Sequence, residues 1–263
     1  MIIRRTFRAA AVLAVLSIAA AARAQSAPAT GLELFDQMYQ AYRGKWYSTV
    51  TFVQKTTTKR ADGTDSIATW YESLRYTQPR GSQLRIDFGP PALGNGVLYT
   101  ADSLWVMKAG QLAATRGHGN ALLPLIDGVY MQPASRTAAE LASTGVDLSR
   151  KPVLAQWEGN TVWIIGVTSA ADTTSPRFVV DSATLNVVRA VFSFAPGRDL
   201  DARFKDLVRV GGGWLAVRCE FYEGGKLATT EEYSDWKGNV DLPASLFDIT
   251  QWNVGPHWAA PAR

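Results

Sequence analysis

The segment WLAVRCEFY (Trp214–Tyr222) decides the fold, because apolar and polar side chains alternate along it. One set of alternate positions holds Leu215, Val217, Cys219 and Phe221, and the other holds Ala216, Arg218, Glu220 and Tyr222. Alternation with a period of two predicts a β-strand with one buried and one wet face, which is typical of an antiparallel sheet. The following residues, EGGK (223–226), have the composition of a tight hairpin turn, so the next strand is expected to pair with this one.

Segments of similar character recur along most of the chain and predict a mainly β fold: one curved antiparallel sheet covered by short helices. No Pro-, Ser- or Gly-rich linker interrupts residues 45–250, so a single domain is expected over residues 25–263. The predicted strands are 48–59, 67–76, 83–88, 97–100, 104–108, 153–157, 161–167, 177–181, 187–194, 202–210, 214–222 and 227–236.

Two regions predict helices instead. Thr30 and Glu33 form a capping box, apolar residues then recur at helical spacing, and Gly44 is suited to the end of the helix. In the middle of the chain, residues 120–142, here called the insert, predict two short helices or one broken helix. A second capping box is expected there at Thr137–Glu140.

The first 24 residues have the composition of a secretory signal peptide. Arg4, Arg5 and Arg8 precede an apolar stretch, and Ala22-Arg23-Ala24 predicts cleavage after Ala24. The alternative, an uncleaved membrane anchor, is disfavoured because the stretch is short and rich in Ala. Four of the 27 basic residues lie in this segment, which leaves 23 basic and 23 acidic residues and no basic cluster that would indicate a nucleic-acid partner.

The residues that carry chemistry are few. With one Cys and two His there is no disulfide and no zinc-ligand spacing, and the nucleophile-elbow, phosphate-loop and dinucleotide motifs are missing from the sequence. We therefore predict no catalytic residue, no metal and no cofactor. A hydrolase that uses Cys219 remains an alternative, although Cys219 falls on the apolar face of its strand. Glu72 and Glu232 could each face the interior as a functional acid or lie solvated at the rim of the sheet.

The aromatic residues allow two interpretations. Nine Trp, nine Tyr and ten Phe either pack a core or line a ligand cavity. In the second case the predicted cavity wall comes from the strands, and the predicted lid comes from the insert. The wall residues would be Phe52, Trp70, Ile86, Phe88, Trp105, Phe192, Phe194 and Phe221, and the lid residues would be Leu122, Leu123, Ile126, Tyr130 and Met131.

Short motifs in the first half of the chain resemble the outer-membrane lipoprotein carriers, the LolA family. These are GNGVLYTADSLWVM (94–107), in which Leu104-Trp105 follows a turn, and LRIDF (84–88), which follows Pro79. The resemblance implies an unclosed β-barrel of about eleven strands with helices as a lid over an apolar cavity.

The same resemblance implies a periplasmic, monomeric carrier of the acyl chains of lipoproteins or other lipids. Its partners would be an inner-membrane donor and an outer-membrane acceptor. The anchored receptor LolB needs a Cys at its mature N-terminus, where this chain has Gln25, and RseB-like sensors need a second domain. A lipid sensor or scaffold of the same fold stays open as an alternative to a carrier.

Overall fold

The computed structural model describes residues 27–195 and 198–259, and their main element is one antiparallel sheet of 13 strands. The predicted signal peptide, 1–24, lies outside the described residues. The strands are β1 (Thr49–Lys59), β2 (Asp65–Thr77), β3 (Gly81–Phe88), β4 (Gly96–Tyr99), β5 (Leu104–Lys108), β6 (Gln111–Arg116), β7 (Val153–Trp157), β8 (Asn160–Ile165), β9 (Arg177–Asp181), β10 (Val187–Ala195), β11 (Arg198–Val210), β12 (Gly213–Glu223) and β13 (Lys226–Gly238).

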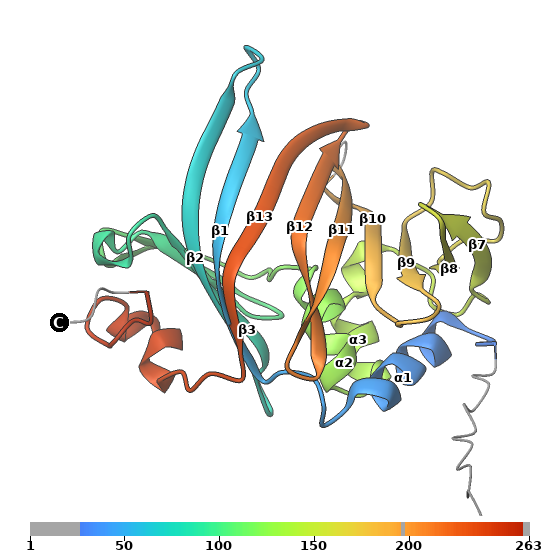
Figure 1. The fold of residues 1–263 in the computed structure, drawn as a ribbon, viewed down its shortest axis with the longest axis horizontal. Helices are drawn as coiled ribbons and strands as arrows, with labels where there is room; N and C mark the ends of the chain where they lie inside the picture. Colours follow the sequence, from blue (N-terminus) through green and yellow to red (C-terminus); the bar gives the residue numbers. More distant parts are fainter. Residues whose placement is uncertain (1–26, 196–197, 260–263) are drawn as a thin grey trace, which may run out of the picture.

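The strand order shows how the sheet is built. It runs β6-β5-β4-β3-β2-β1-β13-β12-β11-β10-β9-β8-β7, so the pairing of β1 with β13 joins two runs of consecutive neighbours. The sheet is not closed, which confirms the predicted open, curved sheet (Figure 1). It has more strands than the eleven or so expected. No strand was predicted at β6, because five of its six residues are exposed and its sequence lacks alternation.

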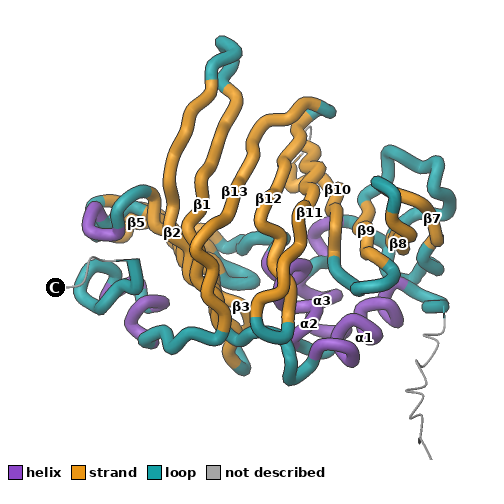
Figure 2. Tube along the Cα trace, in the orientation of Figure 1, coloured by secondary structure: helices purple, strands orange, loops and turns teal. Residues whose placement is uncertain are grey.

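Helices α1, α2 and α3 gather on one face of the sheet, which we call the inner face (Figure 2). No helix among the described residues is long and apolar enough to cross a membrane. The helical segments are α1 (Gly31–Tyr42), α2 (Val129–Met131) and α3 (Ala134–Glu140), with shorter turns η1 (Pro91–Leu93), η2 (Pro124–Gly128), η3 (Ala142–Thr144), η4 (Ala244–Phe247) and η5 (Ile249–Gln251).

Helix α1 begins at the predicted capping box. The Glu33 amide donates a hydrogen bond to Thr30 Oγ1 (3.1 Å), and the Ala29 amide donates to Glu33 Oε2 (2.7 Å). The amides of Gly31 and Leu32, also in the first turn, donate to the carbonyls of Arg150 and Leu148, so both the cap and a remote loop satisfy the start of the helix. Leu34, Phe35, Met38 and Tyr42 form its buried face.

The insert folds as η2, α2, α3 and η3. Helix α3 begins directly after Pro133, so the predicted capping box at Thr137–Glu140 is wrong. Proline fixes φ near the helical value and starts the helix earlier than the Thr would. Thr137 lies within α3, fully buried, and its Oγ1 is 3.3 Å from Gln132 Nε2.

The opposite, outer face of β3 is buried as well. Its alternating residues Arg85 and Asp87 are 2 % and 0 % exposed and form a two-pronged ion pair with N–O distances of 2.7 and 2.8 Å. The C-terminal segment covers them: the guanidinium donates to the carbonyls of Leu246 and Trp252 and stacks on the Trp252 ring, and His257 Nε2 lies 3.0 Å from Asp87 Oδ2. The pair therefore attaches the end of the chain to the sheet.

The buried pair predicts a large loss of stability when one partner is removed. Asp87→Ala leaves an uncompensated buried guanidinium and is expected to lower the free energy of unfolding by about 3–5 kcal/mol. The control is Asp65→Ala, which breaks the exposed pair between Lys59 and Asp65 and should cost less than about 1 kcal/mol. Urea unfolding measures both, and equal losses would contradict a structural role for the buried pair.

Candidate functional site

A cavity of about 270 Å³ lies between the inner face of the sheet and the insert. The register places Phe52 of β1, Glu72 of β2 and Ile86 of β3 side by side in one row of its wall. Leu122 and Ile126 of the insert close it from the other side. The lining is mostly aliphatic and aromatic, as in sites for apolar ligands.

Six of the predicted site residues meet in this cavity. They are Phe52, Trp70, Ile86, Leu122, Ile126 and Phe221. Four of them come from different strands (β1, β2, β3 and β12) and two come from the insert, and the order of the strands in the sheet brings the four together. The structure thus groups about half of the predicted set around one space.

The other predicted residues lie elsewhere. Leu123 and Tyr130 are buried in the core on the far side of the insert, Met131 and Phe192 pack in the same core, and Phe88 packs on Trp70 with ring centroids 4.8 Å apart. Trp105 lies on the outer face with Leu98 and Trp252, because its neighbours Leu104 and Val106 take the inner face. The side chain of Phe194 lies outside the described residues.

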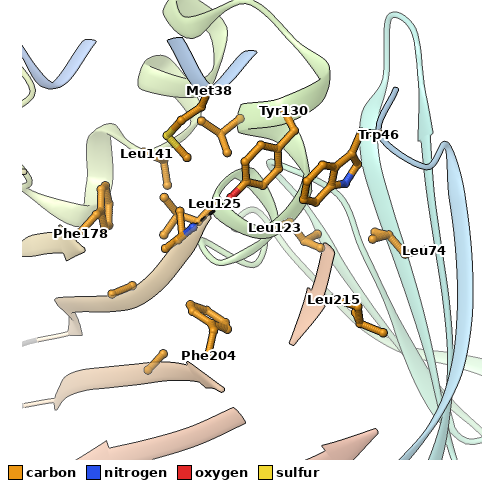
Figure 3. Close-up of a cluster of buried hydrophobic side chains, with 14 of the residues drawn as sticks. Met38, Trp46, Leu74, Leu123, Leu125, Tyr130, Leu141, Phe178, Phe204 and Leu215 are labelled. Carbon is orange, nitrogen blue, oxygen red and sulfur yellow. Dashed lines mark hydrogen bonds between the residues drawn. The ribbon is translucent and has the colours of Figure 1, made fainter. Parts of the chain in front are cut away.

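The insert is held firmly on the side away from the cavity. The Tyr130 ring stacks on Trp46 with centroids 3.8 Å apart, and its hydroxyl accepts a hydrogen bond of 3.0 Å from the Val187 amide (Figure 3). Ser82 Oγ of β3 donates to Asp127 Oδ2 at 2.6 Å. Leu122 and Ile126 therefore face the cavity from a segment whose other side is anchored to sheet and core.

Two carboxyl groups line the cavity. Glu72 is 4 % exposed, and Glu231 of β13 is partly buried with its Oε2 accepting a 2.6 Å hydrogen bond from the Tyr233 hydroxyl. Burial, and then the nearby Glu231, raise the pKa of Glu72 well above its usual range, and burial also raises the pKa of Glu231. The described residues that line the cavity include no Lys, Arg or His, so no protein cation balances these groups.

Glu232, named beside Glu72 from the sequence, points away from the cavity. It forms an exposed ion pair with Lys55, while Glu231 faces inward. The pairing of β1 with β13 shifts register between Thr51 and Val53, opposite a bulge at Asp235, whose φ is +53°. The bulge reverses which face of the sheet the following side chains of β13 point to. Counting in steps of two from Trp236 therefore assigns Glu232, instead of Glu231, to the inner face. Counting from Leu227 would have selected Glu231.

Cys219 also lines the cavity and is 3 % exposed. Burial, followed by the charge of Glu231, raises the pKa of its thiol, which disfavours the thiolate that a nucleophile needs. His257 contacts Asp87 on the outer face, and His118 is exposed in a loop. Neither histidine of the described residues therefore lies beside the thiol, and the carboxyl next to it in the sheet, that of Glu231, raises the pKa of the thiol further.

Comparison with known proteins supports the fold assignment. No protein-family model and no curated protein matches the chain. Among solved structures, it is similar to a DUF1329 family protein from Desulfovibrio piger (16% identity, TM-score 0.56, 83% of this chain and 95% of that chain). It is also similar to a putative outer membrane lipoprotein-sorting protein domain from Vibrio parahaemolyticus (16% identity, TM-score 0.56, 85% and 98%).

A LolA superfamily protein from Nitrosomonas europaea also matches, with 14% identity, a TM-score of 0.47 and coverage of 81% and 95% of the two chains. At these identities the similarities show the fold alone. The fold, one unclosed antiparallel sheet with a few short helices, is shared with the first two of these structures.

The anchor of the insert predicts a pH dependence of stability. Burial raises the pKa of Asp127 from 3.8 to about 7, against the opposing effect of its hydrogen bond from Ser82. The protonated carboxyl therefore makes its full contribution to the free energy of unfolding below about pH 4. This contribution, up to roughly 4 kcal/mol, is lost as the pH rises from there through 7.

Asp127→Asn removes this titration and keeps the acceptor for Ser82. The difference in unfolding free energy between wild type and variant should fall steadily from about pH 4 to pH 8 in urea titrations. The control, Thr69→Ala at an exposed position of β2, removes no titratable group and should show a constant difference. A constant difference for Asp127→Asn would show that this carboxyl is not held protonated.

Proposed function

We propose that this protein is an exported, periplasmic carrier that holds an acyl chain of a lipoprotein or another lipid in the cavity and moves it towards the outer membrane. The observation that carries the proposal is the apolar cavity between the row of Phe52 and Ile86 and the insert residues Leu122 and Ile126. The predicted signal peptide and the fold shared with a putative lipoprotein-sorting domain support it. The inner-membrane donor, the outer-membrane acceptor and the monomeric state belong to the same proposal.

The driving force would be the transfer of methylene groups from water into the cavity, at about 0.8 kcal/mol each. The cavity volume of about 270 Å³ lies just below the usual range of roughly 300–1,000 Å³ for ligand pockets. A long chain therefore needs Leu122 and Ile126 to move outward. Their contacts with the sheet are exchanged for contacts with the lipid, which keeps binding and release nearly balanced.

A neutral fluorescent probe, N-phenyl-1-naphthylamine, tests the cavity. It should bind the wild type, gain emission and quench tryptophan, because Trp70 and Trp214 line the cavity. Ile126→Asp places a charge against the apolar wall and should weaken binding at least about tenfold. Ile67→Asp, at a β2 position that is 65% exposed, is the matched control and should bind like the wild type.

Equal binding by wild type, Ile126→Asp and Ile67→Asp would show that the probe binds outside the cavity. Absence of probe binding to the wild type would overturn the proposal. If the probe binds the cavity but no lipid moves from donor vesicles to acceptor vesicles, the protein is a sensor or scaffold of this fold rather than a carrier.

Lid movement predicts a change in hydrogen exchange. In the lipid-bound protein the amides of Leu122 to Ile126 should exchange faster than in the free protein, because lipid replaces their contacts with the sheet. The amides of Leu34 to Met38 are the internal control, because they belong to α1, whose buried side chains pack in the fixed core. They should keep their protection. Unchanged protection at Leu122 to Ile126 would mean that the insert is a fixed part of the core.

A further inference from the structure

The carboxyl group of Glu72 in the cavity has no evident structural role. Glu72 sits in the middle of a row between Phe52 and Ile86, where an apolar residue would pack without cost. Its carboxyl group has no hydrogen-bond partner among the described residues, although the side chain is 4 % exposed and lines the cavity. A buried polar group without a partner lowers stability. Such a group, aimed into a cavity, indicates a ligand that supplies the missing partner.

A second carboxyl group, that of Glu231, lines the same cavity. Its charge adds to the effect of burial in raising the pKa of Glu72. The Tyr233 hydroxyl donates a hydrogen bond to Glu231 Oε2, and the Gln54 side chain also favours the charged form of Glu231. The site therefore offers several acceptor oxygens, while the described side chains that line it bring no positive charge.

The chemistry of the missing partner follows from this excess of acceptors. A protonated primary amine carries three N–H donors and one positive charge, and its hydrogen bonds to carboxylates are of the strong, charge-assisted kind. Its charge also favours the ionised form of a nearby carboxyl. A carboxylate or phosphate head group would instead meet like charge or compete for the same protons.

We propose that the cavity binds a cationic amphiphile, with a primary amine on Glu72 and Glu231 and its alkyl chain along Phe52, Ile86, Leu122 and Ile126. This inference rests on the proposed function, because the alkyl chain occupies the same apolar space. It adds selection by head group: lipids with an accessible amine bind, and purely anionic lipids are disfavoured. The two glutamates supply attraction for one class and repulsion for the other.

Three ligands with the same chain test the head group: decylamine, decanol and decanoic acid, each displacing N-phenyl-1-naphthylamine at about pH 7. The wild type should bind decylamine at least about tenfold more tightly than decanol, and decanoic acid most weakly. Glu72→Gln keeps the shape of the side chain but cannot ionise. It should lose most of the preference for the amine while its affinity for decanol stays within about twofold.

Glu232→Gln is the matched control, since Glu232 is the next residue to Glu231 but points outward to Lys55, and it should behave like the wild type. Glu231→Gln serves as a second cavity variant should Glu72→Gln fail to fold. The comparison of the three ligands on the wild type needs no variant at all.

The outcomes separate the two proposals. If decanol and decanoic acid bind the wild type as tightly as decylamine, or if neither cavity variant reduces the amine preference, the amine site is overturned while the lipid-binding cavity stands. If neither the probe nor any of the three ligands binds, both proposals fail together.

Discussion

The rest of the structure depends on one constraint: an open sheet must bury its inner face, and its helices cover that face unevenly. On the inner face at β9 to β12, α1 and the anchored side of the insert fill the space (Figure 1), and the rings of Phe35 and Phe178 have a centroid distance of 6.3 Å. Around β1 to β3 and β13, the insert contributes only Asn120, Leu122 and Ile126 to the lining. The cavity is the space that this uneven cover leaves, so its position follows from the topology.

The anchors of the insert determine what can move. Opening the whole insert would unstack Tyr130 from Trp46 and break the bonds from Ser82 to Asp127 and from the Val187 amide, all inside the core. The side chains of Leu122 and Ile126 are only partly buried, so they can move while Leu123 and Leu125 between them stay in the core. The fold therefore favours a small gate over a large lid, and a small gate suits a ligand that enters chain first and leaves its polar end near Glu72.

Much of the fold could be predicted from the sequence, because alternation and helix caps are local signals. Phe52, Trp70, Ile86 and Phe221 were placed on the cavity wall by counting in twos along single strands. The method failed where the partner of a segment is remote. Arg85 and Asp87 alternate with apolar residues, which is the pattern of a wet face, but the C-terminal segment buries them. Because of the bulge at Asp235, counting in twos did not identify Glu231 as an inward-facing residue. Trp105 has the pattern of a wall residue but lies on the outer face. Which face of a strand is buried, and which segment covers it, depend on the tertiary structure.

Native mass spectrometry of the mature protein, isolated from the periplasm of cells that produce it with its own N-terminal segment, tests the central claim most directly. The account predicts a population that carries one noncovalently bound amphiphile, and release and fragmentation of that molecule should show an alkyl or acyl chain with an amine at its polar end. Protein that is free of any bound lipid under conditions that keep other lipid complexes intact would contradict the account. A bound lipid without an amine would contradict the role given to Glu72 and Glu231.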